Sequence, residues 1–178
     1  MSLFVNTFFE DRLQDLFNLA ARVEKAFSAA GIEYRVVGGL AVYLYVEESE
    51  ADAGRLTKDI DIVVRREDRP RIVEAAEPFG LEFRHTAGVD MLVQKGQPST
   101  RRAVHMIFDG PDPGEGRILR GIPVVLLADL VTMKLTSFRA KDEAHINDLD
   151  EQGLITPEIE ASLPPILRDR LARARARE

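Results

Sequence analysis

A pair of glycines, Gly38 and Gly39, stands between two apolar runs, and this arrangement constrains the fold more than any other feature of the sequence. The run over residues 32–37 is short and rich in branched side chains, which predicts a strand. The run over residues 40–46 predicts a mostly buried helix, although its β-branched residues weaken that prediction. A glycine pair between a strand and a helix lets backbone N–H groups approach a phosphate at the helix N-terminus. The alternative is an ordinary turn in which glycine supplies a positive φ.

Two carboxylates lie in the next apolar run. Asp59 and Asp61 flank Ile60 and follow the segment Arg55-Leu56-Thr57. Alternate side chains of a strand share a face, so the two aspartates are expected to project together. Mg²⁺ prefers oxygen ligands, keeps several waters and is completed by substrate phosphates. We therefore predict a site for Mg²⁺ or Mn²⁺ at Asp59 and Asp61; the alternative is the solvated face of a half-buried strand.

Composition limits the classes of protein to consider. With 178 residues, 45% of them hydrophobic, the chain is expected to form one globular domain. Cysteine is absent, which excludes disulfides, thiolate metal sites and a cysteine nucleophile. A formal charge of −6 argues against extensive non-specific binding to nucleic acid. No signal-peptide pattern or membrane-length apolar run is present in the sequence, so we expect a cytoplasmic location and no membrane partner.

The remaining patterns predict further helices and two strands. The strands, over residues 89–94 and 103–108, are expected to pair antiparallel across a loose hairpin loop. A helical pattern spans residues 126–149, with a break after Phe138. A first helix is expected from a cap at Asn6 or Thr7 to a stop at Gly31, with its apolar stripe over residues 13–27. Other helices are expected from Asp68 to Pro78, from Thr156, and over residues 166–177.

Several of these segments together resemble the nucleotidyltransferase superfamily that includes DNA polymerase β, and in particular its AbiEii-like bacterial branch. The resemblance rests on the glycine pair that begins a helix, on Arg55-x-Thr57-x-Asp59-x-Asp61, and on Met133-Lys134-Leu135 followed by Arg139-x-Lys141-Asp142 and Asp148. It implies an α+β (mixed α/β) fold, in which helices pack on a small mixed sheet. We expect a single domain over residues 1–178, with residues 126–178 as a helical C-terminal extension.

The resemblance also implies an activity. Members of the superfamily transfer a nucleoside monophosphate from an NTP to a hydroxyl, phosphate or amine acceptor and release pyrophosphate, a reaction that asks for positioning and charge stabilisation. The residues implied to bind the nucleotide are Gly38, Gly39, Arg55, Thr57, Lys134 and Arg139. Asp59, Asp61 and His105 are the candidate catalytic residues.

The third carboxylate of the family pattern is missing from its expected place. His105 stands there, in Ala103-Val104-His105-Met106. A neutral imidazole can act as general base near pH 7, but it is a poorer magnesium ligand than carboxylate and favours manganese or a transition metal. Asp90 on the neighbouring strand and Asp109 beyond the strand end are alternatives. A purely structural histidine is the remaining interpretation.

The helical region after residue 126 carries the basic candidates. On a continuous helix Lys134 and Lys141 share a face, and Arg139, Asp142 and His145 lie on an adjacent one. Lys134 can hold phosphate. We expect Asp142, a possible third ligand or helper, and Asp148 to orient the basic residues, and His145 to be a surface or capping residue.

Three functions compete. The first is a metal-dependent nucleotidyltransferase acting on an NTP and on a small-molecule, RNA or protein acceptor. The second is a catalytically degenerate module of the same fold that binds a nucleotide or a partner protein. A toxin-antitoxin role is implied by the AbiEii-like resemblance, and self-association is open. Tyr43, Tyr45 and Phe83 are expected in the core, with base stacking as the alternative.

Overall fold

The computed structural model describes residues 2–50, 54–55, 57–96, 102–108 and 113–176, with side chains from residue 10 onward. The helices are α1 (Ser2–Ala30), α2 (Gly38–Ser49), α3 (Arg69–Ala76), α4 (Leu127–Ser137), α5 (Ala140–Glu151), α6 (Pro157–Ser162) and α7 (Pro165–Arg175). The strands are β1 (Tyr34–Val37), β2 (Ile60–Val64), β3 (Leu81–Thr86), β4 (Val89–Gln94), β5 (Val104–Ile107), β6 (Gly116–Leu119) and β7 (Ile122–Val125). The expected α+β class is confirmed.

The strands form one mixed sheet in the order β3-β4-β5-β2-β1-β7-β6. Strand β2 pairs antiparallel with β1 and parallel with β5, and β5 pairs antiparallel with β4. This register aligns Val37, Asp61, His105 and Met91 in a row across the four strands. Paired residues project to the same face of a sheet, so Asp61 and His105 lie next to each other on one face.

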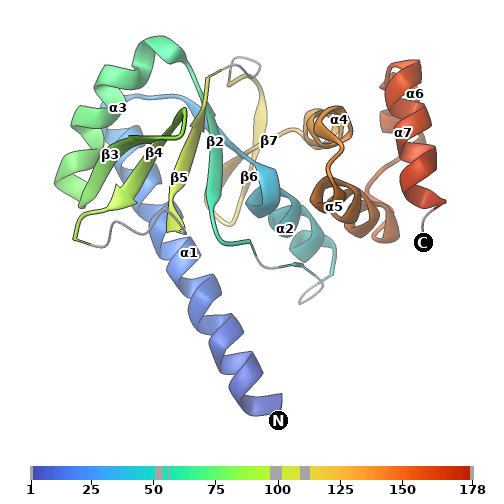
Figure 1. Ribbon diagram of the computed structural model, residues 1–178, viewed down its shortest axis with the longest axis horizontal. Coiled ribbons are helices and arrows are strands. Elements are labelled where there is room, and N and C mark those ends of the chain that lie inside the picture. The colour runs from blue at the N-terminus through green and yellow to red at the C-terminus, as the bar shows by residue number, and fades with distance from the viewer. Residues whose placement is uncertain (1, 51–53, 56, 97–101, 109–112, 177–178) are drawn as a thin grey trace.

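Helix α1 runs across one face of the sheet and packs against α3, while α4 to α7 gather at one side of it (Figure 1). The buried stripe of α1 includes Leu19, Val23 and Phe27, and the helix ends where Gly31 adopts a φ of 62°. The expected stop at Gly31 is therefore confirmed, because only glycine enters this left-handed region at little cost.

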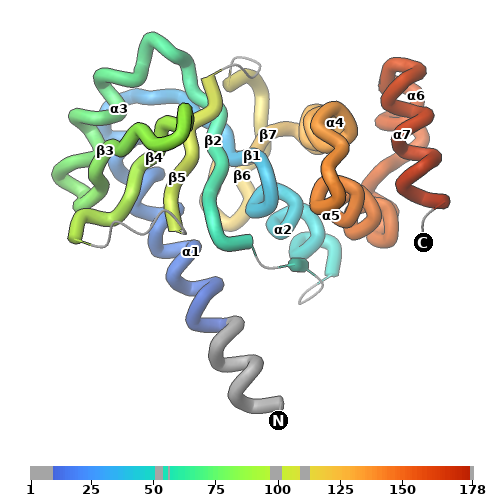
Figure 2. Tube along the Cα trace, viewed as in Figure 1, coloured from blue at the N-terminus to red at the C-terminus, as the bar shows by residue number. Residues whose placement is uncertain are grey.

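Helix α2 follows β1 without a loop, as the trace in Figure 2 shows. All residues from Gly39 to Val46 are buried. The segment is helical despite its β-branched residues because burial on all sides outweighs their modest cost in helix propensity. The uncertain helix of the sequence analysis is thus confirmed.

The C-terminal helices pack on the same hydrophobic core as the sheet. Phe138 takes a left-handed conformation with φ 44°, which ends α4 and confirms the expected break. The Arg170 guanidinium on α7 donates to the carbonyls of Leu135 and Thr136, both at 2.7 Å, and satisfies the open end of α4. Leu167 and Leu171 are buried in the main hydrophobic cluster. None of the helices in the described part of the chain has the length and apolar character needed to cross a bilayer.

The sequence analysis missed three strands, β3, β6 and β7. Strands β3 and β6 are the sheet edges and keep several side chains exposed, so their apolar pattern is weak. The hairpins turn through Ala87-Gly88 and Arg120-Gly121, whose φ angles are all positive. Two consecutive positive φ values characterise the two-residue hairpin turn that favours glycine at its second position. These two Xaa-Gly pairs were the sequence feature from which the β3–β4 and β6–β7 hairpins could have been predicted.

Candidate active site

The glycine pair allows the start of α2 to lie directly against the β2 segment. Gly38 has a φ of +69°, and a Cβ there would lie 2.1 Å from Asp61 Oδ2. A Cβ on Gly39 would lie 2.8 Å from Thr57 Oγ1. Val37 caps the helix without a side-chain hydrogen bond, so no side chain at the cap position occupies the first N–H groups of α2. Uncapped N–H groups and the positive end of the helix dipole therefore adjoin Asp61.

Asp59 and Asp61 both line the space in front of this helix. Asp59 Oδ1 is buried and has no hydrogen-bond partner among the described residues. A buried carboxylate oxygen without a donor is unfavourable, and a cation would relieve the cost. In the described part of the chain no three His, Asp or Glu side chains form a metal cluster. Two aspartates alone fit Mg²⁺, which keeps waters and takes its other ligands from phosphates.

His105 is the side chain that β5 places beside Asp61. Its Nδ1 lies 3.1 Å from Asp61 Oδ1, and about a quarter of the imidazole is exposed. The hydrogen bond to Asp61 raises the pKa of His105, while burial opposes that rise. A neutral His105 that donates from Nδ1 leaves Nε2 as a proton acceptor.

Asp90 lies on the other face of the sheet, which corrects its expected position. Asp90 pairs with Met106, the residue that follows His105 on β5. Successive residues of a strand face opposite sides of the sheet, so the Asp90 side chain projects away from the face that carries His105 and Asp61. There it bonds to His85 and to Arg69 Nε, the latter at 2.9 Å. Asp109, the other alternative, falls outside the described residues.

Asp142 holds the basic residues of the α4–α5 junction in place. Lys134 Nζ donates to Asp142 Oδ1 at 3.0 Å, and Ser137 Oγ and Arg139 Nε donate to Oδ2 at 2.7 and 2.8 Å. Burial acts to raise the pKa of Asp142, but these hydrogen bonds outweigh it and keep the pKa well below its ordinary value. Both Asp142 oxygens are thus occupied, which fits the helper role and not that of a third metal ligand.

The basic side chains come from two helices. Because the chain breaks at Phe138, Lys134 and Lys141 do not share one helical face as expected. They nevertheless line the same space, together with Arg139. Lys134 is almost fully buried and uses one of its three donors on Asp142, which leaves donors for phosphate.

His145 was expected to be a surface or capping residue and instead lines the candidate site. Its Cε1 lies 3.6 Å from the position of a Cβ on Gly39, and its Nδ1 is buried without a partner among the described residues. Burial, helped by the charge of Lys134, lowers its pKa to about 4, so the imidazole is neutral near pH 7. The spacing of Asp142, His145 and Asp148 on one face of α5 was the signal that could have placed it.

Arg55 lies apart from the other candidates. Its side chain is 63% exposed and Nε donates to Asp148 Oδ1 at 2.7 Å. Thr57 lines the site and donates to the Asp59 carbonyl at 3.3 Å. Tyr43 and Tyr45 are buried in the core, as expected.

A cleft of about 880 Å³ joins these groups. Its lining includes Gly38, Gly39, Asp59, Asp61, His105, Lys134, Arg139, Lys141 and His145. Carboxylates and an imidazole stand at the sheet side and basic residues at the helical side. This volume lies within the range of about 300–1,000 Å³ that small-ligand sites occupy.

The mixed sheet, with the glycine pair at the start of α2, Asp61 on β2 and Asp59 just before it, has a nucleotidyltransferase fold. No protein-family model matches the chain, and no curated protein matches it in sequence. Solved structures do match. An antigenic nucleotidyltransferase-like protein from Paracoccidioides brasiliensis superposes with a TM-score of 0.62 and 16% identity, over 93% of this chain and 89% of that protein.

Two further solved structures also match at low sequence identity. ANT(2″)-Ia in complex with adenylyl-2″-tobramycin matches with a TM-score of 0.55 and 12% identity, over 90% of this chain and 97% of that chain. JHP933 from Helicobacter pylori matches with a TM-score of 0.50 and 14% identity, over 94% and 91% of the two chains. At these identities the likeness establishes the fold.

Proposed function

We propose that this protein is a nucleotidyltransferase that uses Mg²⁺ or Mn²⁺ to move a nucleoside monophosphate from an NTP to an acceptor. One observation carries the proposal: Asp59 Oδ1, buried and without a partner among the described residues, belongs to a side chain that shares the cleft with Asp61 and with the N-terminus of α2, where no side chain caps the helix. A carboxylate oxygen without a donor attracts a hard cation, and the helix end attracts phosphate. An NTP bound together with its metal ion supplies both the cation and the phosphate groups.

Groups from several elements of the chain would bind the NTP in the cleft. Gly38 and Gly39 offer N–H groups to a phosphate, and Lys134 on α4 and Arg139 just before α5, held by Asp142, offer positive charge to the same cleft. Asp59 and Asp61 would hold the metal ion. When bound, that ion would stabilise negative charge on the transferring and leaving phosphates.

His105 is suited to the proton transfer. The acceptor oxygen forms a bond to the α-phosphorus, the bond from that phosphorus to the bridging oxygen breaks, and pyrophosphate leaves. The acceptor proton passes to His105 Nε2, while Asp61 keeps the ring oriented through Nδ1. A complex of ANT(2″)-Ia with adenylyl-2″-tobramycin, a nucleotidylated molecule, supports transfer to an acceptor by this fold.

Calorimetry of each NTP with Mg²⁺ and with Mn²⁺, combined with pyrophosphate detection, tests the proposal. We expect metal-dependent binding by the wild type and its loss in the Asp59→Asn/Asp61→Asn variant. Asp90→Asn is the matched control, because this carboxylate faces the other side of the sheet and should leave binding unchanged. Equal NTP binding by the wild type and the double variant would refute the metal site.

The second candidate is a degenerate nucleotide- or partner-binding module. The imidazole of His105 in place of a carboxylate favours it, since imidazole is a weak magnesium ligand. Binding without pyrophosphate release by the wild type, and release by His105→Asp, would support this module. Loss of release in His105→Gln with intact NTP binding would support the enzyme.

A toxin-antitoxin role is a further part of the proposal and rests on the AbiEii-like resemblance. Induced expression of the wild type is then expected to arrest bacterial growth, and expression of Asp59→Asn/Asp61→Asn is not. Normal growth with both proteins would count against the role.

A further inference from the structure

The cleft continues past His105 over an apolar part of the sheet. His105 lies between Asp61 on β2 and Met91 on β4 in the row that crosses these strands. Ile107 lies two residues after His105 on β5, and Val89 lies two residues before Met91 on β4, so both share the face that carries His105. Met91, Ile107 and Val89 all line the cleft. A ligand beside His105 therefore meets apolar side chains on the side away from Asp61.

Helix α4 adds two apolar side chains to the same cleft. Leu130 and Met133 stand three residues apart, which places them on one side of the helix, and both line the cleft. Leu130 is buried, but Met133 is partly exposed and Val89 is 40% exposed. Apolar side chains gathered along a cleft beside a few polar groups are typical of a small-molecule site. We call the following five residues the apolar part of the cleft: Val89, Met91, Ile107, Leu130 and Met133.

The carboxylates of the cleft are all engaged. Among the described residues that line it, the carboxylates are Asp59, Asp61 and Asp142. Both oxygens of Asp142 already accept hydrogen bonds, from Lys134 and Arg139 among others. Asp59 and Asp61 are the residues proposed to hold the metal ion. The described lining thus has no carboxylate left for an ammonium group of an acceptor.

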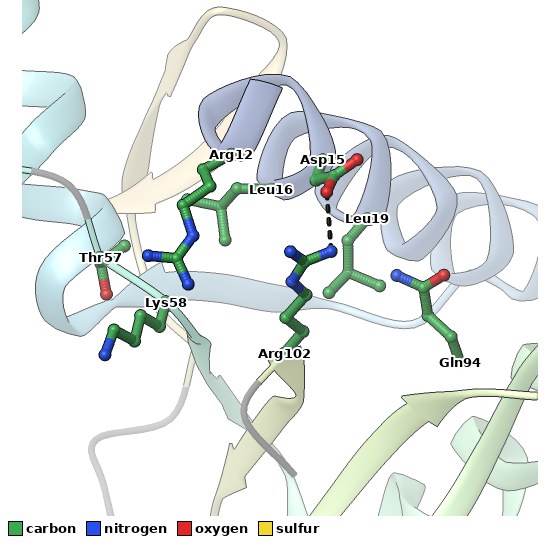
Figure 3. Close-up of a pocket in the computed structure, with 8 residues that line it drawn as sticks. All are labelled: Arg12, Asp15, Leu16, Leu19, Thr57, Lys58, Gln94 and Arg102. Atoms are coloured by element: carbon green, nitrogen blue, oxygen red, sulfur yellow. Dashed lines mark hydrogen bonds and ion pairs between the residues drawn. The ribbon is translucent and has the colours of Figure 1, made fainter. Parts of the chain in front are cut away.

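Cationic side chains outnumber these carboxylates. Those in the described lining of the cleft are Lys58, Lys134, Arg139 and Lys141. Figure 3 shows the ammonium group of Lys58 turned away from Arg12 and Arg102, with which Lys58 also lines a small neighbouring pocket. An acceptor with several ammonium groups would be repelled by the cationic side chains of the cleft, and the bound metal ion would add to that repulsion.

From these contacts we infer that the apolar part of the cleft binds the acceptor, and that the acceptor is a small hydroxyl compound with an apolar, uncharged body. This inference rests on the proposed function, in which the acceptor hydroxyl gives its proton to His105 Nε2. Met91 adjoins His105 on the side away from Asp61, so the body of the acceptor lies over the apolar part. Methionine side chains adapt to the shape of a ligand and contact aromatic rings favourably, which suits an aromatic body.

The methionine methyl groups report binding to this part of the cleft directly. Their NMR signals are followed with isotope-labelled methionine and assigned with methionine-to-leucine variants. Met91 and Met133 line the apolar part, while the Met106 side chain projects to the other face of the sheet and serves as the internal control. The probes are benzyl alcohol, a neutral aromatic hydroxyl compound, and tobramycin, which carries several amino groups.

We expect benzyl alcohol to shift the Met91 and Met133 signals saturably and with one common Kd, and to leave Met106 nearly unchanged. Tobramycin at the same concentrations should give no saturable shift of either signal. Absence of the benzyl alcohol shifts, or equal or tighter binding of tobramycin, would overturn the inference.

Two matched valine substitutions locate the contact. Val89→Ser should weaken benzyl alcohol binding at least about threefold, because part of the apolar area is lost. Val73→Ser is the control: Val73 lies on α3, is 37% exposed and is not part of the cleft lining, so benzyl alcohol should bind this variant as it binds the wild type. Equal weakening by both substitutions would show that the alcohol does not bind at the apolar part.

Calorimetry with NTP and Mg²⁺ separates the acceptor from a nucleobase, the competing occupant. Val89→Ser should bind NTP as the wild type does, and benzyl alcohol should bind alongside NTP. Displacement of benzyl alcohol by NTP, or weaker NTP binding in Val89→Ser, would assign the apolar part to the nucleobase and overturn the inference. Benzyl alcohol binding by a protein that binds no NTP would instead refute the proposed function and with it the acceptor role, so the two failures are distinguishable.

Discussion

Gly38 combines two constraints in one position. Its φ of +69° is unfavourable for any other residue, and the space that a side chain would need is filled by the Asp61 carboxylate. We expect Gly38→Ala to lose at least about tenfold in metal-dependent NTP affinity and about 1–3 kcal/mol of stability. Calorimetry and urea unfolding measure the two effects.

Gly121→Ala provides the control for Gly38. Gly121 has a φ of +77° in the β6–β7 turn, and a Cβ there meets nothing within 4 Å. Gly121→Ala therefore introduces the backbone strain without a contact at Asp61. The variant should lose stability but keep its affinity for NTP. A Gly38→Ala protein that binds NTP normally would contradict the role given to the glycine pair.

His145 should make stability depend on pH. Its pKa of about 4 in the folded protein lies below the ordinary value of about 6.5, so the unfolded chain takes up the proton first as pH falls. Stability is lost between pH 6.5 and pH 4, by about 1–3 kcal/mol from this residue. Urea unfolding at pH 7 and pH 4.5 should show a smaller loss for His145→Gln than for the wild type. If His145→Gln loses as much stability as the wild type does, the buried imidazole is not the cause.

The junction of α4 and α5 is held by one buried carboxylate. Asp142 has no exposed side-chain surface and pairs with Lys134, which is 7% exposed. Removing one partner of a buried pair leaves an uncompensated charge, so Asp142→Asn should cost about 3–5 kcal/mol in chemical denaturation. The exposed Asp129→Asn on α4 should cost less than about 0.5 kcal/mol.

A double-mutant cycle measures the interaction energy between Lys134 and Asp142 apart from their contacts with other residues. Lys134→Met/Asp142→Leu removes both charges, and its loss of stability should be smaller than the sum of the two single losses. Strict additivity would show that the two side chains act independently. The same double variant should lose NTP affinity, since Lys134 lines the cleft.

The predictability of each element follows its position in the molecule. Helix α1, the Gly31 stop and strand β2 were predicted because their apolar period is strong and local. Strands β3 and β6 were missed because edge strands expose one side and keep few buried side chains. The helix–helix break at Phe138 was anticipated, but its consequence, the placement of Lys134 and Lys141 on different helices, was not.

For the molecule as a whole, we expect a single cooperative unfolding transition. The C-terminal helices share the main hydrophobic cluster with the sheet, and Leu171 on α7 is fully buried. Leu171→Ala should cost about 2–5 kcal/mol and shift the transition without splitting it. Ile166→Ala, at a position 63% exposed, should have little effect. Circular dichroism and calorimetry measure both, and two separate transitions would show that α6 and α7 unfold on their own.

The sequence by itself determined the local parts of this protein: the glycine pair before α2, the strand that carries Asp61, and most helix boundaries. These follow from strand and helix periods and from the backbone freedom of glycine, which act within a few residues. The tertiary structure alone decided that His105 stands beside Asp61 while Asp90 faces away, and that His145 lines the cleft. Strand order and helix docking bring these side chains together across long stretches of sequence, and no local pattern encodes them.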